Sequence, residues 1–287
     1  MLIQRLQSGV SSAIRSGLAA SYRAKPMGSL GITAFVLLLT VGIFQGACSG
    51  GSRLPQASDP GTPTKDYSTS FPMTENPISE NGHWIGGQSA GSNIWGKVLW
   101  GNVQTRENMA VGVSNPTKFG DPTAILSGAW EPNHTVSATV RIKSTPRGKC
   151  CREVELRLRT TISAKSITGY EAYCSVMPDN PYCHIARWNG PNGSYCNIES
   201  STPSMYAADG DVLAASVTGT NPVVVTMFKN GTQILQATDS GQNCSPGGPA
   251  GPFSSGNPGI GFYGDQDSDW SSFGFSTMSA QDDTQKP

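Results

Sequence analysis

The stretch VSATVRI, Val136–Ile142, alternates apolar with polar side chains, and VELRLRT, Val154–Thr160, repeats the pattern. Successive side chains of a strand point to opposite faces, so a period of two predicts strands with one face in a core. Val223–Phe228 (VVVTMF) is more continuously apolar, as expected for a central strand. Turn-forming Asn-Gly pairs punctuate the chain and begin at Asn81, Asn189, Asn192 and Asn230. Past residue 65 the sequence has no run with a helical period, so it predicts an all-β domain, a sandwich or barrel.

Several segments resemble paired strands of bacterial concanavalin A-like lectin/glucanase domains. They are Gly169–Tyr173 (GYEAY), His184–Gly190 (HIARWNG), Phe228–Ile234 (FKNGTQI), Asn257–Phe262 (NPGIGF) and Phe273–Phe275 (FGF). The resemblance covers roughly residues 68–280 and implies a two-sheet antiparallel jelly-roll sandwich with one concave sheet, often used for glycans. This fold carries lectins, hydrolases, lyases and inert modules, so the activity has to be argued from the site.

The N-terminal part differs from the rest in charge. Before Cys48 the charged residues are all basic, and Leu30–Phe44 (LGITAFVLLLTVGIF) is apolar. A basic flank, an apolar run and a small-residue exit are typical of a secretory signal. The uncharged stretch is also long enough for a membrane-spanning helix, whose upstream positive charges would keep the N-terminus in the cytoplasm. We therefore expect a signal or anchor helix over residues 1–47 and export of the chain after it; a buried core helix is the alternative.

The segment Gln45–Ser49 (QGACS) resembles a bacterial lipoprotein lipobox, in which Cys48 would become the lipidated first residue. Gly46 and Ala47 fit that pattern, whereas Gln45 stands where Leu is usual. The expectation is a protein anchored through its N-terminus on the extracytoplasmic side of a bacterial membrane. An uncleaved anchor and a cleaved, released protein are the alternatives.

The exported part divides into three segments. Residues 48–65 are mostly Gly, Ser, Pro and Thr and predict a flexible tether. Residues 66–280 suit one large β-sandwich domain, and residues 281–287 (QDDTQKP) predict a disordered tail. All 20 acidic residues but only 16 of the 20 basic residues lie after Cys48. This slightly acidic balance argues against nucleic acid as a partner.

The seven cysteines are an odd number, and a lipidated Cys48 leaves six for three bridges. An oxidising compartment makes such bridges plausible. The six candidates are Cys150, Cys151, Cys174, Cys183, Cys196 and Cys244. Cys174 and Cys183 flank a turn that can bring two antiparallel strands together, so they are the favoured cross-strand pair. The adjacent Cys150 and Cys151 are expected to pair with separate partners.

One face of the strand from Glu153 carries Glu153, Glu155, Arg157 and Arg159. Related glucanases place carboxylates at alternate positions of one strand, and a retaining hydrolase needs two carboxyls about 5–5.5 Å apart. Here Arg157 takes the third acidic position, and the neighbouring cations are expected to lower the pKa of both glutamates. We therefore expect a solvated ladder of ion pairs on this face and no glycosidase turnover.

Two further enzyme motifs are incomplete. Glu155-Leu156-Arg157 resembles part of a polysaccharide lyase motif, with His184 on a nearby strand, but Tyr182 stands where that family requires Gln. Gly87–Gly91 (GQSAG) matches the G-x-S-x-G nucleophile pattern. That pattern works on a strand–turn–helix elbow, and the sequence predicts no helix after it, so a Gly/Ser loop is expected.

Asp265, Asp267 and Asp269 offer oxygen ligands at alternate positions, which suits a structural Ca²⁺ on the rim of the domain. An EF-hand loop would also need Gly at its sixth position and Glu at its twelfth, where this chain has Trp270 and Ser276. A solvated acidic turn is the alternative. No Cys/His spacing suggests zinc, and no other cofactor is expected.

The chain has six tryptophans, most of them expected in the core because aromatic residues dominate burial. Trp188 and Trp270 lie beside turn-rich segments and are the predicted sugar-stacking residues, with Arg157 and Glu155 as further candidate contacts. The leading hypothesis is an envelope-tethered, non-catalytic module that binds a polysaccharide or cell-wall glycan. A polysaccharide-cleaving hydrolase or lyase and a structural or protein-interaction module are the alternatives. A carboxylate pair with raised pKa would favour the enzyme.

Overall fold

The residues that the computed structural model describes are 65–90, 98–113, 119–146, 151–163, 166–190, 193–200, 204–242, 251–264 and 269–283. The predicted signal or anchor segment 1–47, the lipidation site Cys48 and the tether up to residue 64 lie outside these ranges. In the described part of the chain, no helix is long and apolar enough to cross a membrane.

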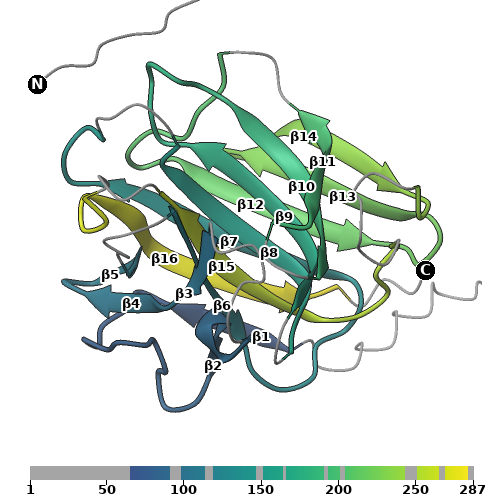
Figure 1. Cartoon of the computed structure of the whole chain (residues 1–287), viewed down its shortest axis with the longest axis horizontal. Helices are drawn as coiled ribbons and strands as arrows, with labels where there is room; N and C mark the ends of the chain where they lie inside the picture. Colours follow the sequence, from purple (N-terminus) through teal and green to yellow (C-terminus); the bar gives the residue numbers. More distant parts are fainter. Residues whose placement is uncertain are drawn as a thin grey trace, which may run out of the picture. The chain divides into compact units, whose positions relative to one another are not determined.

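Two β-sheets make up the domain, and we name each after a central strand (Figure 1). The β7 sheet has the order β14 (Thr232–Asp239), β13 (Val223–Lys229), β12 (Val212–Thr218), β7 (His134–Ile142), β16 (Phe273–Asp282), β5 (Met109–Gly112) and β4 (Val103–Arg106), with β1 (Asp66–Thr69) beside β16. The β8 sheet has the order β11 (Tyr195–Ser200), β10 (Cys183–Gly190), β9 (Ile167–Ser175), β8 (Glu153–Ile162), β15 (Asn257–Tyr263), β6 (Phe119–Leu126) and β2 (Trp84–Gly86). Pairing is antiparallel except where β3 (Val98–Gly101) adds in parallel to β6. The predicted two-sheet antiparallel jelly-roll sandwich is confirmed.

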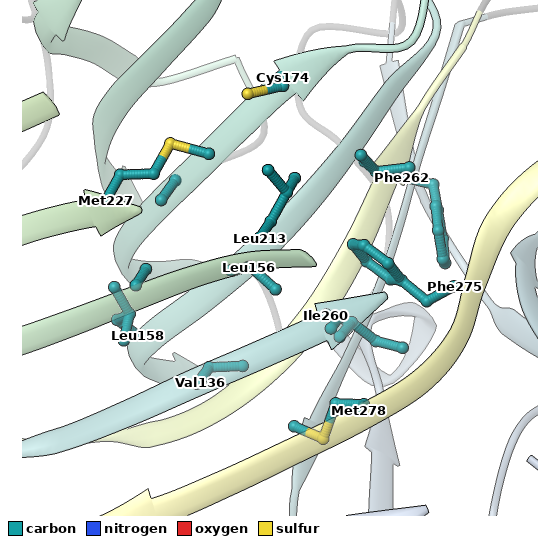
Figure 2. Packing of buried hydrophobic residues seen from close by; sticks show 14 of the residues in the cluster. Val136, Leu156, Leu158, Cys174, Leu213, Met227, Ile260, Phe262, Phe275 and Met278 are labelled. Carbon is teal, nitrogen blue, oxygen red and sulfur yellow. The ribbon is translucent and has the colours of Figure 1, made fainter. Parts of the chain in front are cut away.

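The core lies between the two sheets and uses the period-two pattern of the sequence (Figure 2). Val136, Ala138 and Val140 of β7 alternate with half-buried polar residues, as the sequence predicted. Leu156 and Leu158 of β8 belong to the same apolar cluster. Strand β8 is different from β7, because most of its residues are buried on both of its faces. Its polar side chains are therefore covered as well, and they form the candidate functional site.

The predicted Cys174–Cys183 disulfide is confirmed, with the two Cα atoms 4.1 Å apart. These cysteines lie directly opposite each other in the β9–β10 pair. Cys151 and Cys196 are also disulfide-bonded. Cys150 and Cys244 lie outside the described residues, so the predicted separate pairing of Cys150 and Cys151 stays a prediction.

Two boundaries differ from the expectation. Strand β16 continues to Asp282, two residues into the predicted disordered tail. Its end is held by backbone hydrogen bonds, from Asp282 to the Lys65 carbonyl at 2.9 Å and from Asp283 to the Asn133 carbonyl at 2.8 Å. In place of the expected loop, Gly87–Ala90 forms a single turn of 3₁₀ helix (η1). Four residues are too short for the helix of a nucleophile elbow.

Candidate functional site

A pocket of about 170 Å³ opens on the face of the β8 sheet that points away from the core. Ligand pockets for drug-sized molecules are typically about 300–1,000 Å³, so this one suits a single ring-sized group. Six strands and the segments next to them supply the described wall residues, which are Asp121, Cys151, Glu153, Glu155, Glu171, Tyr173, Trp188, Gly193, Tyr195 and Tyr263. Four of these are acids and four are aromatic.

Strand register brings the four acids together from distant parts of the sequence. Glu153 and Glu155 share a face of β8, and Arg157 follows on the same face, directly opposite Glu171 of β9. On the other side Gly261 of β15 lies opposite Glu155. A Cβ at Gly261 would collide with Glu155 Oε2 and lie 2.9 Å from Arg157 Nε. Glycine at this position therefore leaves the room that the Glu155 and Arg157 side chains occupy.

The guanidinium of Arg157 is shared by three carboxylates. Its Nη2 lies 2.7 Å from Asp121 Oδ1 and 2.5 Å from Glu155 Oε2, and its Nη1 lies 2.7 Å from Glu171 Oε2. Arg157 itself is 1% exposed and does not belong to the described pocket wall. A molecule in the pocket therefore meets the carboxyl groups of the described wall and not this cation.

Burial raises the pKa of all four acids. The pKa of Glu153 is about 8, although the Tyr182 hydroxyl donates a hydrogen bond to it. The pKa of Asp121 is about 7, because burial outweighs the attraction of Arg157. Burial likewise raises the pKa of Glu155 well above its usual range and raises that of Glu171. The four groups share one cation in a site of low dielectric, so they are not all ionised at neutral pH.

These findings correct the expectation of a solvated ion-pair ladder with glutamates of lowered pKa. Glu155 is buried and Glu153 is half-buried, and desolvation dominates over Arg157 for both. Arg159 does not join the ladder either. The register of β8 against β9 shifts between Leu158 and Thr161, and Arg159 has a φ of 45°. Such an irregularity re-aims a side chain, and the Arg159 guanidinium donates instead to carbonyls of Pro132, Phe253 and Gly219 at 2.6–2.9 Å.

Trp188 and Tyr195 form the aromatic wall of the pocket. Trp188 donates its indole N–H to Glu171, and its ring centroid lies 4.8 Å from that of Tyr195. Only 5% of Trp188 is exposed, whereas Tyr195 is 45% exposed. Trp188 was predicted to stack on a sugar; it lies in the pocket wall but is almost covered, and Tyr195 offers the accessible ring.

Trp270 was also predicted to bind the ligand, and the structure corrects this. It is 4% exposed, belongs to the core cluster, and stacks on Phe273 with ring centroids 6.1 Å apart. A Cβ on Gly112 would collide with its ring, which shows how closely the backbone packs against it. Position beside a turn was therefore no sign of exposure.

For the predicted rim calcium site, Asp265 and Asp267 lie outside the described residues. Asp269 closes a local turn, where its Oδ1 accepts hydrogen bonds from the Ser271 backbone at 3.1 Å and hydroxyl at 2.7 Å. The acidic cluster that the structure does form is Glu153, Glu155 and Glu171, with one oxygen of each within 4.8 Å of the others. Carboxylate oxygens suit a hard cation such as Ca²⁺, although Arg157 already contacts two of the three.

The residues considered for a lyase also meet beside the pocket. Tyr182 donates its hydroxyl hydrogen bond to Glu153, and the His184 ring lies 5.3 Å from the rings of both Tyr182 and Tyr173. Burial lowers the pKa of His184. Tyr182 therefore links this aromatic group to Glu153 of the pocket wall.

Sequence reasoning missed five wall residues that contribute chemistry: Asp121, Glu171, Tyr173, Tyr195 and Tyr263. For one of them, Glu171, the sequence did contain a signal. Glu171 lies at an inner position of a strand whose other residues are almost all buried, and a carboxyl there needs a partner. The partner could not be named without the register of β8 against β9.

No known family model and no curated protein matches the chain. Among solved structures it is similar to a carbohydrate-binding module, CBM66 from Bacillus subtilis, with 14% identity, a TM-score of 0.42, and coverage of 70% of this chain and 92% of that one. It is also similar to porphyranase B from Zobellia galactanivorans, with 9% identity, a TM-score of 0.42, and coverage of 79% and 97%. An inactivated β-agarase B mutant in complex with agaro-octaose gives 10% identity, a TM-score of 0.44, and coverage of 82% and 99%. Likenesses this distant do not say what the chain binds, so its own residues have to carry the functional conclusion.

Proposed function

We propose that the domain binds a glycan in the pocket of the β8 sheet. The observation that carries this proposal is the combination of an accessible ring, Tyr195, with Trp188 and four carboxyl groups around one ring-sized space. Sugar rings have apolar C–H faces that pack on aromatic rings, and their hydroxyls need acceptors and donors. The carboxyl oxygens and the tyrosine hydroxyls of the wall supply both.

The hollowed face also bears on the alternative of a purely structural module. That alternative predicts a flat face filled by ion pairs. The observed face has a pocket whose wall acids exceed the cation behind them, and such an arrangement costs stability without a ligand. A binding role accounts for the cost.

The test of binding is a titration of the purified protein against a panel of oligosaccharides, with two matched tyrosine variants. Tyr195→Ala removes the exposed ring of the pocket, and we expect affinity to fall by about threefold to tenfold, from the roughly 0.5–1.5 kcal/mol of one aromatic contact. Tyr206→Ala is the control, because the Tyr206 ring lies by Lys229 and is not in the described pocket wall. Equal loss in both variants, or none in either, would remove the pocket from consideration.

A second candidate function, glycoside hydrolysis, is supported by one specific observation. Glu153 is a carboxyl with a pKa of about 8, and its oxygen lies within 4.8 Å of those of Glu155 and Glu171, which contact Arg157. Hydrolysis with retention needs a protonated carboxyl close to an ionised one, typically about 5–5.5 Å apart. Glu153 would donate the proton to the leaving oxygen, and an Arg157-paired carboxylate would attack the anomeric carbon. The expectation of no turnover rested on lowered pKa values, which the site does not have.

Reducing-sugar release over a polysaccharide panel decides between binding and hydrolysis. The variants are Glu153→Gln, which removes the proposed proton donor, and Glu155→Gln, which removes a partner of Arg157. Release by the wild type that Glu153→Gln abolishes would establish hydrolysis. A protein that binds a sugar of the panel and releases none would remain a binding module.

We also propose that the protein is exported and held at a bacterial envelope through lipid on Cys48. The support is the basic, apolar and small-residue sequence before Cys48, and the fact that Cys48 is the odd one when the other six cysteines form three bridges. Mass spectrometry of the mature N-terminus tests this, and an intact segment from Arg23 to Pro55 would contradict it. Cys48→Ala should abolish lipidation and leave the sandwich folded.

A further inference from the structure

All the charged side chains among the described residues of the pocket wall are acidic. Asp121, Glu153, Glu155 and Glu171 come from β6, β8 and β9, and no basic side chain is among the described residues of the wall. The cation that compensates them in part, Arg157, is buried and already shared by three of them. A cationic group entering the pocket therefore meets carboxyl oxygens and no other cation among the described residues of the wall.

The same wall presents the faces and edges of four aromatic rings: Tyr173, Trp188, Tyr195 and Tyr263. Aromatic rings beside carboxylates are the surroundings in which proteins hold ammonium and guanidinium groups, because the ring face carries partial negative charge. One of the protein's own cations has such surroundings: the Arg157 guanidinium lies 5.5 Å from the Trp188 ring centroid and contacts three carboxylates.

We infer that the pocket selects a sugar that carries a free, protonated amino group over its N-acetylated, neutral and uronic acid counterparts. This inference rests on the proposed glycan binding and names the substrate class of that site. A uronate would place a like charge beside the wall acids and further disfavour their ionised forms. A neutral sugar supplies no charge to pair with a wall carboxylate, whereas an ammonium group pairs with the ionised form and gains the aromatic contacts.

Protonation of the wall acids supports the same choice. Their pKa values are raised because burial and mutual repulsion disfavour the ionised forms. A bound cation favours those forms. Binding of an ammonium group is therefore linked to loss of protons from the wall, while binding of a neutral sugar is not.

The test compares four oligosaccharides of equal length: a glucosamine oligomer, its N-acetylated form, a glucose oligomer and a galacturonate oligomer. Titration calorimetry with the purified full chain, near pH 6 where the amine is protonated, gives the four affinities. We expect the glucosamine oligomer to bind at least about tenfold more tightly than the neutral pair and the galacturonate oligomer to bind most weakly. Raising the salt from about 0.1 M to about 1 M should weaken only the amine complex, because salt screens charges.

Each outcome decides something. Equal or tighter binding of the neutral oligomers, or tightest binding of galacturonate, overturns the amine inference and leaves glycan binding standing. Failure of all four to bind overturns the inference together with the proposed function for these sugar classes.

Two matched glutamates localise the effect. Glu153→Gln keeps the shape and the acceptor for the Tyr182 hydroxyl, and we expect it to lower the affinity for the glucosamine oligomer about tenfold more than the affinity for the glucose oligomer. Glu107→Gln removes an exposed acid that pairs with Lys143 in another part of the domain, and it should change neither. A Glu153→Gln protein that unfolds at the wild-type temperature yet keeps the full amine preference would contradict the role given to the wall.

Discussion

Arg157 and Arg187 are both 1% exposed on strands of the same sheet, but their partners differ. Arg187 donates to Asp239 at 2.6 Å, to the Asn189 amide oxygen at 3.0 Å and to the Gln242 carbonyl at 2.6 Å. One carboxylate and neutral acceptors satisfy it. Arg157 is surrounded by three carboxylates, with a fourth acid, Glu153, beside them.

The difference separates a structural buried charge from a functional one. A buried cation matched by one acid and by neutral hydrogen bonds holds elements together, and removing either partner is expensive. A buried excess of acids over cations is unfavourable in the free protein, and such perturbed groups gather where a ligand or substrate supplies the missing charge. We therefore call the Arg187–Asp239 group the balanced network and the Arg157 group the acid-rich cluster.

The largest expected effect comes from removing one charge from each group without changing shape. Asp239→Asn leaves Arg187 buried without its carboxylate and should lower the free energy of unfolding by roughly 3–5 kcal/mol. Glu155→Gln relieves repulsion in the acid-rich cluster and should change it by less than about 1 kcal/mol. Urea unfolding of both variants measures the difference. Equal losses would show that the two networks do not differ in the way described.

The pH dependence of stability should come from the acid-rich cluster. Glu153 and Asp121 have folded-state pKa values of about 8 and about 7, above their usual 4.5 and 3.8. The folded state thus holds protons that the unfolded state has released, and this stabilisation is complete at low pH and lost as pH rises through those values. His134, with a pKa lowered to about 4 by burial, acts in the opposite sense below about pH 6.5.

Between about pH 6.5 and 8 only the carboxyls, and not His134, therefore change the free energy of unfolding. It should fall by about 2 kcal/mol over this window, since each proton contributes roughly 1.4 kcal/mol per pH unit. Chemical unfolding at a series of pH values measures it. Glu153→Gln should flatten the curve. A wild-type stability that rises with pH over this window would contradict the raised pKa values.

A glycine beside each group allows the effect of an added methyl group on the balanced network and on the acid-rich cluster to be compared. A Cβ on Gly251 would lie 2.6 Å from Asp239 Oδ2 and 2.9 Å from Arg187 Cδ, inside the balanced network. Gly251→Ala should cost about 1–3 kcal/mol, as overpacking usually does. Gly261→Ala presses on Glu155 and Arg157 beside an open pocket, so we expect a smaller loss of stability and a weaker affinity for the glycan. Thermal unfolding and titration of both variants separate these effects, and the reverse order would argue against the pocket.

The smallest effects concern two tyrosine hydroxyls. Tyr170 donates to Asp239 at 2.8 Å and accepts from the Phe253 backbone at 2.9 Å, so Tyr170→Phe should cost about 1–1.5 kcal/mol. Tyr182→Phe removes the hydrogen bond that lowers the pKa of Glu153. It should cost less stability and raise that pKa further, which an NMR titration of the Glu153 carboxyl would show. An unchanged titration would mean that the hydroxyl does not contact Glu153 in solution.

The sequence was sufficient for the strands and for one covalent link. Alternation in Val136–Ile142 predicted the buried face of β7, and the turn between Cys174 and Cys183 predicted their bridge. Both are local properties. A period of two assigns side chains to faces, and a short turn between two cysteines limits their separation.

The candidate site could be predicted only in part, because it depends on which strands become neighbours. Glu155 was named from one strand, but its environment is set by Asp121 and Glu171, which are brought in by pairing across β6, β15, β8 and β9. Alternation also does not tell whether a polar face is solvated or covered. For that reason the predicted direction of the glutamate pKa shifts was wrong, and the buried Trp270 was predicted to stack on a sugar.

The disulfide between Cys174 and Cys183 has a consequence for the pocket, because it fixes the register of two strands that supply its wall. It lies on the core side of β9 and β10, with Tyr170 and Ala172, while Glu171 lies on the opposite, pocket side. A slip of one residue exchanges the two faces of a strand, which would send Glu171 into the apolar core and bring Tyr170 to the pocket. The two cysteines are directly opposite each other. Their bond on the core side therefore fixes the register of β9 and β10, and with it which residues of β9 face the pocket.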